Sequence, residues 1–384
     1  MTSLFTTALV AAIVGFGGTL AVVLAAAKGV GADAAQTASW VTGLCLAMAG
    51  TSAILSWRYR MPVVTAWSTP GAVLIAASAV PVGMEAAVGA FMVAGLLIVL
   101  TAGVKPLGEL VARIPASVAS AMLAGVLLRF VLPAFESAQA APALVLPLIG
   151  LFLVARLVSP ASAVLLVLAA GAALAAALGK VGPLPGWIWP QAVFVAPRFD
   201  PSVALGLGVP LYLVTMASQN LPGFAVLRAA GYVPPVRPIL GVTGVASLLT
   251  GLMGAHTSNL AAITAALVTG PDTHPDPARR WPAGVAYGGV YLVFAVLSGF
   301  LVALFAAMPA ELIKTVAGVA LMSPLLGALA AAMGDEKQRF AAVLTLAVTA
   351  SGFSMAGIGS AFWGLAAGIG ALALEAGMRR WRSR

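Results

Sequence analysis

Apolar runs long enough to cross a lipid bilayer recur along the whole chain of 384 residues. A hydrocarbon core about 30 Å thick needs roughly 20 apolar residues in a helix. Only 8% of the residues are charged, whereas soluble domains carry about 25% charged residues. In lipid every backbone N–H and C=O group needs a partner within the protein, and a helix supplies these partners within one segment. The sequence therefore predicts an all-α polytopic membrane protein.

About fourteen transmembrane segments are predicted from the apolar runs between charged residues, Pro and Gly. The first run is read as a retained span and not as a signal peptide, because it lacks a basic start and exceeds the usual 7–15 apolar residues. The approximate limits are 4–27, 37–57, 62–80, 86–104, 115–133, 142–158, 161–179, 203–227, 236–253, 254–269, 282–308, 310–330, 338–355 and 357–378.

Lysine and arginine residues are distributed unevenly between the two ends of these spans. With both termini in the cytoplasm, 15 of the 20 lie on the inner side, which agrees with the positive-inside rule. The five on the outer side are Lys28, Arg129, Lys180, Arg198 and Lys314. Topology thus accounts for the net charge of +9, and no nucleic-acid partner is predicted. Cys45 is the only cysteine, so an intrachain disulfide and a cysteine metal cluster are excluded.

The stretch WSTPG (67–71) interrupts the third segment with residues that break helices. The preceding PVVTAW contains β-branched residues and favours extended backbone. Ser68 or Thr69 can cap a half-helix that starts at Pro70 and continues through GAVLIAASAV. A proline kink in an ordinary span is the alternative.

A similar break occurs in the second half of the chain. TAWSTPGAVLIAA (65–77) aligns with GAHTSNLAAITAA (254–266) at an offset of 189 in the numbering. IPASVASAMLAGVLL (114–128) resembles MPAELIKTVAGVALM (308–322) at an offset of 193 to 194. Because seven spans per half is an odd number, the second copy must be inverted relative to the first.

The repeats are therefore predicted to span 1–190 and 191–384, with segments 3 and 10 broken. In the second copy GLMGAHT is the expected extended part, and Thr257 or Ser258 the expected cap of a half-helix through NLAAITAALV. Two helix N-termini would then face each other at mid-depth. Their partial positive charges and unpaired N–H groups suit an anion.

Four stretches resemble the signature sequences of the bacterial benzoate/proton symporter family. They are AWSTPGAVL, QNLPGFAVLRAAGY, GAHTSNLAAITAALVTGP and HPDPARRW, and the resemblance covers essentially the whole chain. It implies the fold of nucleobase permeases and anion exchangers, a 7+7 inverted repeat. A core domain (1–104 and 203–308) would move against a gate domain (115–179 and 310–378). The resemblance also implies that substrate sits between segments 3 and 10 and is touched by segments 1 and 8.

Nucleobase permeases carry carboxylates in segments 8 and 10, and this chain departs from that pattern. Segment 8 holds no acid, and His256 lies about where the acid of segment 10 would fall. A histidine titrates near neutral pH. Burial favours its neutral ring and an arriving carboxylate favours the imidazolium. His256 is therefore predicted to couple proton and substrate binding, and a structural role is the alternative.

The remaining candidates are polar or aromatic side chains near the two breaks and in segments 1 and 8. For the amides the alternative is hydrogen bonding between helices, and for the aromatic residues it is packing. The predicted substrate-binding residues are Ser68, Thr69, Thr257, Ser258, Asn259, Gln219, Asn220, Phe16 and Trp67.

Two further features have competing interpretations. Asp272, His274 and Asp276 could suggest a metal site, but a cytoplasmic loop in which Arg279 and Arg280 pair with the acids is preferred. Arg129 is predicted to extend its side chain to the outer interface, and contact with an incoming carboxylate is the alternative.

The predicted function is import of benzoate, or a close aromatic carboxylate, together with a proton by alternating access. An inorganic-anion or dicarboxylate exchanger or channel of the same fold is the alternative. A membrane enzyme is disfavoured because His256 has no acid or metal partner in the sequence. No metal and no cofactor are predicted. The expected partners are substrate, proton and lipid, with a homodimer through the gate domain allowed. The expected location is the bacterial inner membrane, with both termini cytoplasmic.

Overall fold

Long helices dominate the computed structural model, which describes residues 2–77, 82–103, 115–160, 162–261, 263–355 and 360–382. Eight helical stretches in this part of the chain are long and apolar enough to cross a membrane. The longest single helices are α1 (Thr2–Gly29), α2 (Ala34–Tyr59), α4 (Met84–Gly103), α6 (Ala116–Ala140), α14 (Trp281–Ala306), α15 (Ala310–Ala332) and α17 (Ser360–Arg382). Their bounds agree with the predicted spans to within a few residues at most ends.

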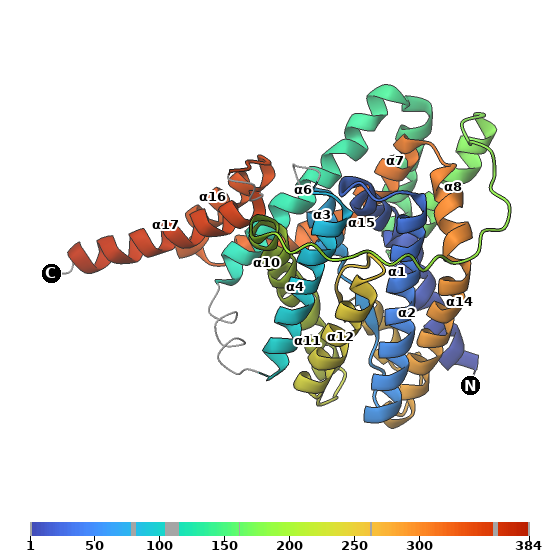
Figure 1. The fold of residues 1–384 in the computed structure, drawn as a ribbon, viewed down its shortest axis with the longest axis horizontal. Coiled ribbons are helices and arrows are strands. Elements are labelled where there is room, and N and C mark those ends of the chain that lie inside the picture. Colours follow the sequence, from blue (N-terminus) through green and yellow to red (C-terminus); the bar gives the residue numbers. More distant parts are fainter. Residues whose placement is uncertain are drawn as a thin grey trace.

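Shorter helices complete the set. They are α7 (Pro142–Val158), α8 (Ala163–Ala177), α12 (Val236–Gly251), α16 (Arg339–Ala350) and the half-helices α3 (Thr69–Ala76) and α13 (Ile263–Thr269). Counted with the long stretches, the described residues form about fourteen segments. In Figure 1 most of them form one bundle, and α16 and α17 extend from it towards the C-terminus.

Segment 3 is broken as predicted. Strand β1 (Thr65–Trp67) is followed by Ser68, whose side chain accepts a hydrogen bond from the Gly71 N–H at 3.1 Å and caps α3. Pro70 lies in the first turn of α3, where its missing N–H removes no hydrogen bond. Residues 78–80, the predicted end of this half-helix, lie outside the described residues.

The predicted start of the second half-helix is wrong. Ser258 opens strand β2 (Ser258–Leu260), and α13 begins only at Ile263. Thr257 and Ser258 therefore belong to extended chain and cap no helix. The reason is pairing between the halves, because the backbone of Ser258 lies opposite Trp67 and buried strands need such partners.

The same pairing corrects the offset between the repeats. Strand β1 begins at Thr65 and strand β2 begins at Ser258, which is an offset of 193 in the numbering. The Ser68 N–H donates to Thr257 O at 3.1 Å, and the Ala261 N–H donates to Val64 O at 2.9 Å. The offset relates these two hydrogen bonds to each other. Ser68 corresponds to Ala261 in the second repeat, and Thr257 corresponds to Val64 in the first. The break therefore follows the longer of the two predicted offsets, and the alignment that matches Thr65 with Gly254 is out of register.

Helix packing follows the same exchange of halves. Helix α2 packs against α14, α4 packs against α12, and α6 packs against α15. In order along the chain these are segments 2 with 11, 4 with 9, and 5 with 12. Segment 2 corresponds to segment 9 in the other repeat, segment 4 to segment 11, and segment 5 to segment 12. The contact of 2 with 11 is therefore equivalent to that of 4 with 9, and the contact of 5 with 12 is equivalent to itself. This is the contact pattern expected of two interlocked inverted repeats.

The eighth segment is a helix with two wide turns. It consists of α9 (Pro201–Val203), η1 (Ala204–Gly208), α10 (Val209–Thr215), η2 (Met216–Asn220) and α11 (Leu221–Ala229). Both η1 and η2 are π-helical. π-Helical turns are rare in proteins, and many of those that do occur lie at functional sites. The second of them contains Gln219 and Asn220, two of the predicted site residues.

An extended strap, residues 180–200, connects the two repeats and crosses the surface of the bundle (Figure 1). Its backbone is tied to the ends of three helical segments, through Gly182 N–H to Ala307 O at 2.8 Å, Val195 N–H to Leu252 O at 2.8 Å and Arg198 N–H to Glu85 O at 2.9 Å. Two glycines permit this close approach. A Cβ atom at Gly89 would meet Arg198 O, and one at Gly299 would meet Trp189 O.

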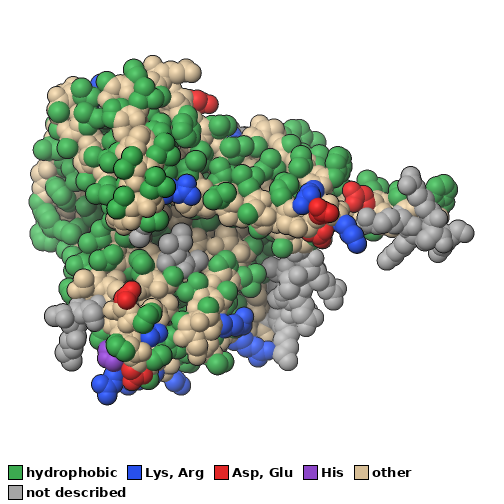
Figure 2. Space-filling model, turned by 180° about the vertical axis from the view of Figure 1, so that it is seen from behind, with side chains coloured by type: hydrophobic (Ala, Val, Ile, Leu, Met, Phe, Trp, Pro, Cys, Tyr) green, Lys and Arg blue, Asp and Glu red, His purple; other side chains and the backbone are tan. Residues whose placement is uncertain are grey.

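Basic side chains gather at one end of the bundle, as Figure 2 shows along its lower edge. Arg58 and Arg60 stand at the end of α2, Arg228 at the end of α11, and Arg279 and Arg280 just before α14. We call this the arginine end. Its location on the cytoplasmic side stays a prediction.

Candidate functional site

Strands β1 and β2 form a buried two-stranded antiparallel ribbon where the two broken segments meet. Trp67 lies opposite Ser258, and Ala66 lies opposite Asn259. Residues directly opposite each other share a face of such a ribbon. The Ser258 side chain therefore lies on the Trp67 face, and the Asn259 side chain lies on the Ala66 face.

Three hydroxyl groups cluster at the start of α3. Thr215 Oγ1 donates to Ser68 Oγ at 3.0 Å and lies 2.9 Å from Thr257 Oγ1. All three residues are fully buried. A threonine hydroxyl has one proton, so Thr257 is the donor to Thr215. The cluster joins segments 3, 8 and 10 at one point.

His256 lies beside this cluster, and both of its ring nitrogens have partners. Trp40 Nε1–H donates to His256 Nδ1 at 3.0 Å, and His256 Nε2 lies 3.1 Å from Ser68 O. An indole nitrogen is a donor only. The network therefore assigns the neutral ring with its proton on Nε2, donating to the Ser68 carbonyl. The ring is completely buried, and it forms no ion pair with a carboxylate among the described residues.

An aromatic cluster covers the other predicted residues. The Phe16 ring lies 5.7 Å from Trp67 and 4.5 Å from Phe294, measured between centroids, and Tyr291 lies 6.0 Å from Trp67. Trp67 Nε1–H donates to Thr19 Oγ1 at 2.9 Å. The cluster thus combines side chains from α1, β1 and α14 around Phe16.

The two amides of segment 8 differ in their surroundings. Asn220 is fully buried, and its Oδ1 accepts from the Leu260 N–H at 3.0 Å. This bond connects η2 to strand β2. Gln219 and Thr69 are only half-buried.

Two polar atoms on β2 stand out because they are buried without a hydrogen-bond partner among the described residues. They are Ser258 Oγ and Asn259 Oδ1. The Asn259 amide nitrogen, by contrast, donates to Leu260 O at 2.8 Å. Unpaired buried polar atoms are costly, and a ligand or an ordered water satisfies such groups.

Comparison with known proteins decides the family. Residues 2–374 match the family model described as benzoate membrane transport protein. The chain belongs to this family. It is 34% identical over 360 residues to the benzoate membrane transport protein of Acinetobacter baylyi, which covers 94% of this chain and 91% of the relative. It is 40% identical over 359 residues to the inner membrane protein YdcO of Escherichia coli, covering 93% and 92% of the two chains.

Solved structures show the fold of this benzoate-transport family member. The transmembrane domain of a cyanobacterial bicarbonate transporter, BicA, superimposes with a TM-score of 0.61 at 18% identity, covering 96% of both chains. Murine Slc26a9, an anion transporter in its inward-facing state, superimposes with a TM-score of 0.61 at 12% identity, covering 97% of this chain and 68% of the other. The predicted all-helical membrane fold with broken helices is confirmed, and the protein is a multi-pass transporter and not an enzyme.

The loop before α14 in this transporter is held by its own backbone. The Asp276 side chain accepts from the Ala278 N–H at 2.9 Å, and Arg279 lies 3.6 Å from it. The predicted pairing of Arg280 with the acids is wrong. Its guanidinium donates to carbonyls of Thr269, His274 and Pro275 instead, because the loop presents three carbonyl oxygens to one planar group with five donors.

Arg129 has a partner that the sequence did not predict, and its extension to the outer interface stays a prediction. Its guanidinium donates to Ala77 O, just beyond α3, at 2.9 Å. It also lies against Gly352, where a Cβ atom would be 3.0 Å from it. Sequence reasoning likewise missed Trp40, Thr215 and Tyr291. Only the YGGVY spacing of Tyr287 and Tyr291, which puts both rings on one helix face, gave a signal.

Proposed function

We propose that this transporter imports benzoate, or a close aromatic carboxylate, together with a proton. The name of the 34% identical relative supports the substrate class. The observation that carries the proposal is the aromatic cluster of Phe16, Trp67, Tyr291 and Phe294 beside the paired strands. An aromatic acid needs an apolar slot for its ring next to donors for its carboxylate.

The proposed site uses the Phe16–Trp67 side for the ring of the substrate. Ser258 lies on the same face of the ribbon as Trp67, and its unpaired hydroxyl can donate to the carboxylate. Ser68 already accepts from Gly71 and Thr215, so its own proton has no acceptor among the described residues and can be offered to substrate. The N-terminus of α3 adds a favourable partial charge.

The other predicted residues have supporting roles in this proposal. Thr257 orients Thr215, and Asn220 holds η2 against β2. Gln219 and Thr69 are half-buried and are proposed as contacts at the edge of the site. Asn259 lies on the opposite, Ala66 face of the ribbon, where its unpaired Oδ1 can accept a hydrogen bond from an ordered water.

Alternating access is proposed to proceed by movement of a core domain (1–104 and 203–308) against a gate domain (115–179 and 310–378). The paired strands, which join segments 3 and 10, would then move as one unit. The close contacts of α6 with α15 and of α2 with α14 support this division, because each pair lies within one proposed domain.

Uptake of labelled benzoate into proteoliposomes, with and without an imposed pH gradient, tests the proposal. Symport of one proton with the monoanion is electroneutral, so each pH unit should support about tenfold accumulation. A protonophore should abolish accumulation. Uptake that ignores the pH gradient but requires a counter-anion inside would establish an exchanger of the same fold instead. The aromatic cluster argues against inorganic anions, because the Phe16 and Phe294 rings have no hydrogen-bond donors and the Trp67 N–H already donates to Thr19.

A further inference from the structure

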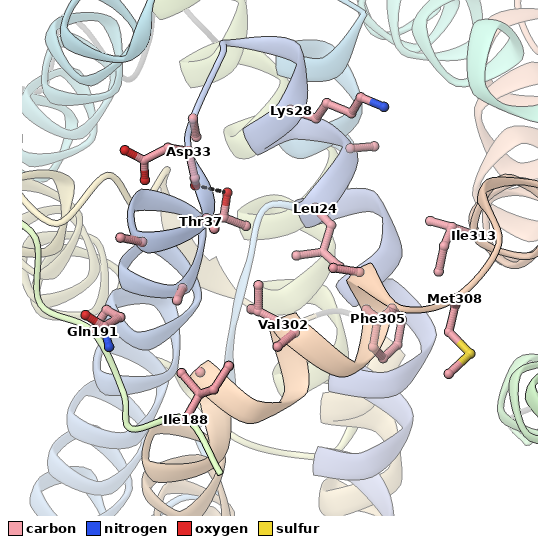
Figure 3. Close-up of a pocket in the computed structure, with 18 of the residues that line it drawn as sticks. Leu24, Lys28, Asp33, Thr37, Ile188, Gln191, Val302, Phe305, Met308 and Ile313 are labelled. Carbon is pink, nitrogen blue, oxygen red and sulfur yellow. Dashed lines mark hydrogen bonds between the residues drawn. The ribbon is translucent and has the colours of Figure 1, made fainter. Parts of the chain in front are cut away.

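A large cavity opens at the end of the bundle opposite the arginine end. Its volume is about 890 Å³, and its walls come from the ends of α1 and α14, the starts of α2 and α15, and the strap (Figure 3). Binding sites for small molecules typically measure about 300–1,000 Å³. We call this space the lysine cavity, because Lys28 and Lys314 line it.

The walls of the lysine cavity are mostly apolar. The aliphatic and aromatic side chains that a ring could contact are Leu24, Ile188, Val302, Phe305, Met308 and Ile313. The last turns of α1 and α14 thus present one part of this apolar surface, and Met308 and Ile313, at the start of α15, present another. In Figure 3 Leu24, Val302 and Phe305 lie around the middle of the view, and Ile313 and Met308 lie to the right of them.

The charges around the lysine cavity favour an anion. Among the described residues that line it, the charged ones are Lys28, Lys314 and Asp33. The Asp33 side chain accepts from the Gln36 N–H at 2.7 Å and caps α2. In Figure 3 its carboxylate points to the side opposite the Lys28 side chain, which extends towards the side of Ile313. Neither lysine forms an ion pair within the described residues.

We propose that the lysine cavity is a second binding site, which takes the carboxylate of an amphipathic aromatic anion between the lysines and its ring against the apolar walls. Substrate held in the lysine cavity would pass from there to the central site, so this inference rests on the proposed function. Leu24 follows Phe16 by eight residues on α1, and Gly299 follows Tyr291 by eight residues on α14. At 1.5 Å per residue the cavity lies about 12 Å beyond the aromatic cluster along both helices.

The chemistry of the walls decides the ligand class. A small inorganic anion would use the lysines but gain nothing from the apolar surface. A neutral apolar molecule would leave two cations without a counter-charge. Both lysines are exposed, so they act chiefly by attracting anions when the substrate concentration is low. This attraction weakens as salt screens the charges.

The test is labelled-benzoate uptake by the Lys28→Gln, Lys314→Gln double variant at low and high salt. We expect the KM for uptake to rise about fivefold, as for the loss of two exposed ion pairs, with the maximal rate retained. The salt dependence of KM should largely disappear. Lys180→Gln is the matched control, because this exposed lysine follows α8 and does not line the cavity.

A second variant tests the apolar walls without changing charge. Ala306→Trp adds a ring at an exposed lining position of the cavity, so the bundle core is not disturbed. It should raise KM to a similar extent. The loss of one exposed charge is expected to change KM by about twofold. The inference is overturned if KM in both variants stays within that factor of the Lys180→Gln control.

Calorimetry separates this inference from the proposed function. Benzoate titrated into the purified protein should show binding that the double lysine variant weakens and Lys180→Gln does not. Wild-type protein that binds benzoate in this lysine-dependent way but takes up none would refute the transport proposal and keep the cavity site. Uptake with equal benzoate binding by wild type and double variant would refute the cavity site alone.

Discussion

His256 shows how one side chain can combine a structural and a functional role. Its neutral ring connects Trp40 to the Ser68 carbonyl, and a second ring proton would face the indole N–H of Trp40. The prediction that His256 couples proton and substrate therefore requires that hydrogen bond to open when the anion arrives. Proton and anion would then bind cooperatively, each raising the affinity for the other.

We expect His256→Ala to lose accumulation driven by a pH gradient, and its benzoate binding to lose the pH dependence that binding by the wild-type protein shows. The alanine also leaves the buried Trp40 Nε1–H unpaired, at about 1–3 kcal/mol, whereas Ser68 O keeps the hydrogen bond from the Ala72 N–H at 2.7 Å. His256→Gln is the sharper variant, because an amide can donate to Ser68 O and accept from Trp40 but does not titrate. Wild-type accumulation in His256→Gln would assign the histidine to hydrogen bonding alone.

At the scale of elements, the cap of α3 depends on a glycine. A Cβ atom at Gly71 would lie 2.7 Å from Ser68 Oγ and 2.9 Å from Ser68 Cβ, so the cap and the hydroxyl cluster would have to shift. We expect Gly71→Ala to destabilise the protein by about 1–3 kcal/mol and to weaken benzoate binding. Thermal unfolding in detergent and calorimetry measure the two effects.

Gly50→Ala provides the matched control, because nothing lies within 4 Å of its Cβ position in α2. Replacing a helical glycine where there is space stabilises by up to about 1 kcal/mol. The two glycine variants should therefore change stability in opposite directions. Equal unfolding temperatures for both would mean that the cap contributes no stability.

The same elements show what the sequence could predict. Ser68 and Pro70 carry their own local signals for a helix start, and the first break was predicted correctly. The second break has no such signal. The residue equivalent to Ser68 in the second repeat is Ala261, which cannot cap, and the polar Thr257 and Ser258 were predicted as caps instead. Their true role comes from pairing with β1, a contact across half the chain that local patterns do not encode. The bond between Trp40 and His256 was missed for the same reason.

At the scale of the whole molecule, Arg129 joins parts that the proposed mechanism must separate. It belongs to α6, in the proposed gate domain, and donates to Ala77 O beside α3, in the proposed core domain. If the core moves against the gate, this hydrogen bond exists only in some states of the cycle. A charged hydrogen bond contributes about 1.5–3 kcal/mol. Its loss would change the equilibrium constant between two states roughly 10- to 150-fold.

We therefore expect Arg129→Met to shift the molecule away from the state described above. The measurement is the thiol-labelling rate of a cysteine placed at half-buried Ser218, beside the proposed site, in a Cys45→Ala background. Because access to Ser218 differs between states that open to opposite sides, the rate should change at least about fivefold. Arg156→Met is the control, since this arginine is exposed on α7 and should leave the rate unchanged. A labelling rate in Arg129→Met equal to that of the control would show that the bond between α6 and α3 persists through transport, and the proposed boundary between core and gate would have to move.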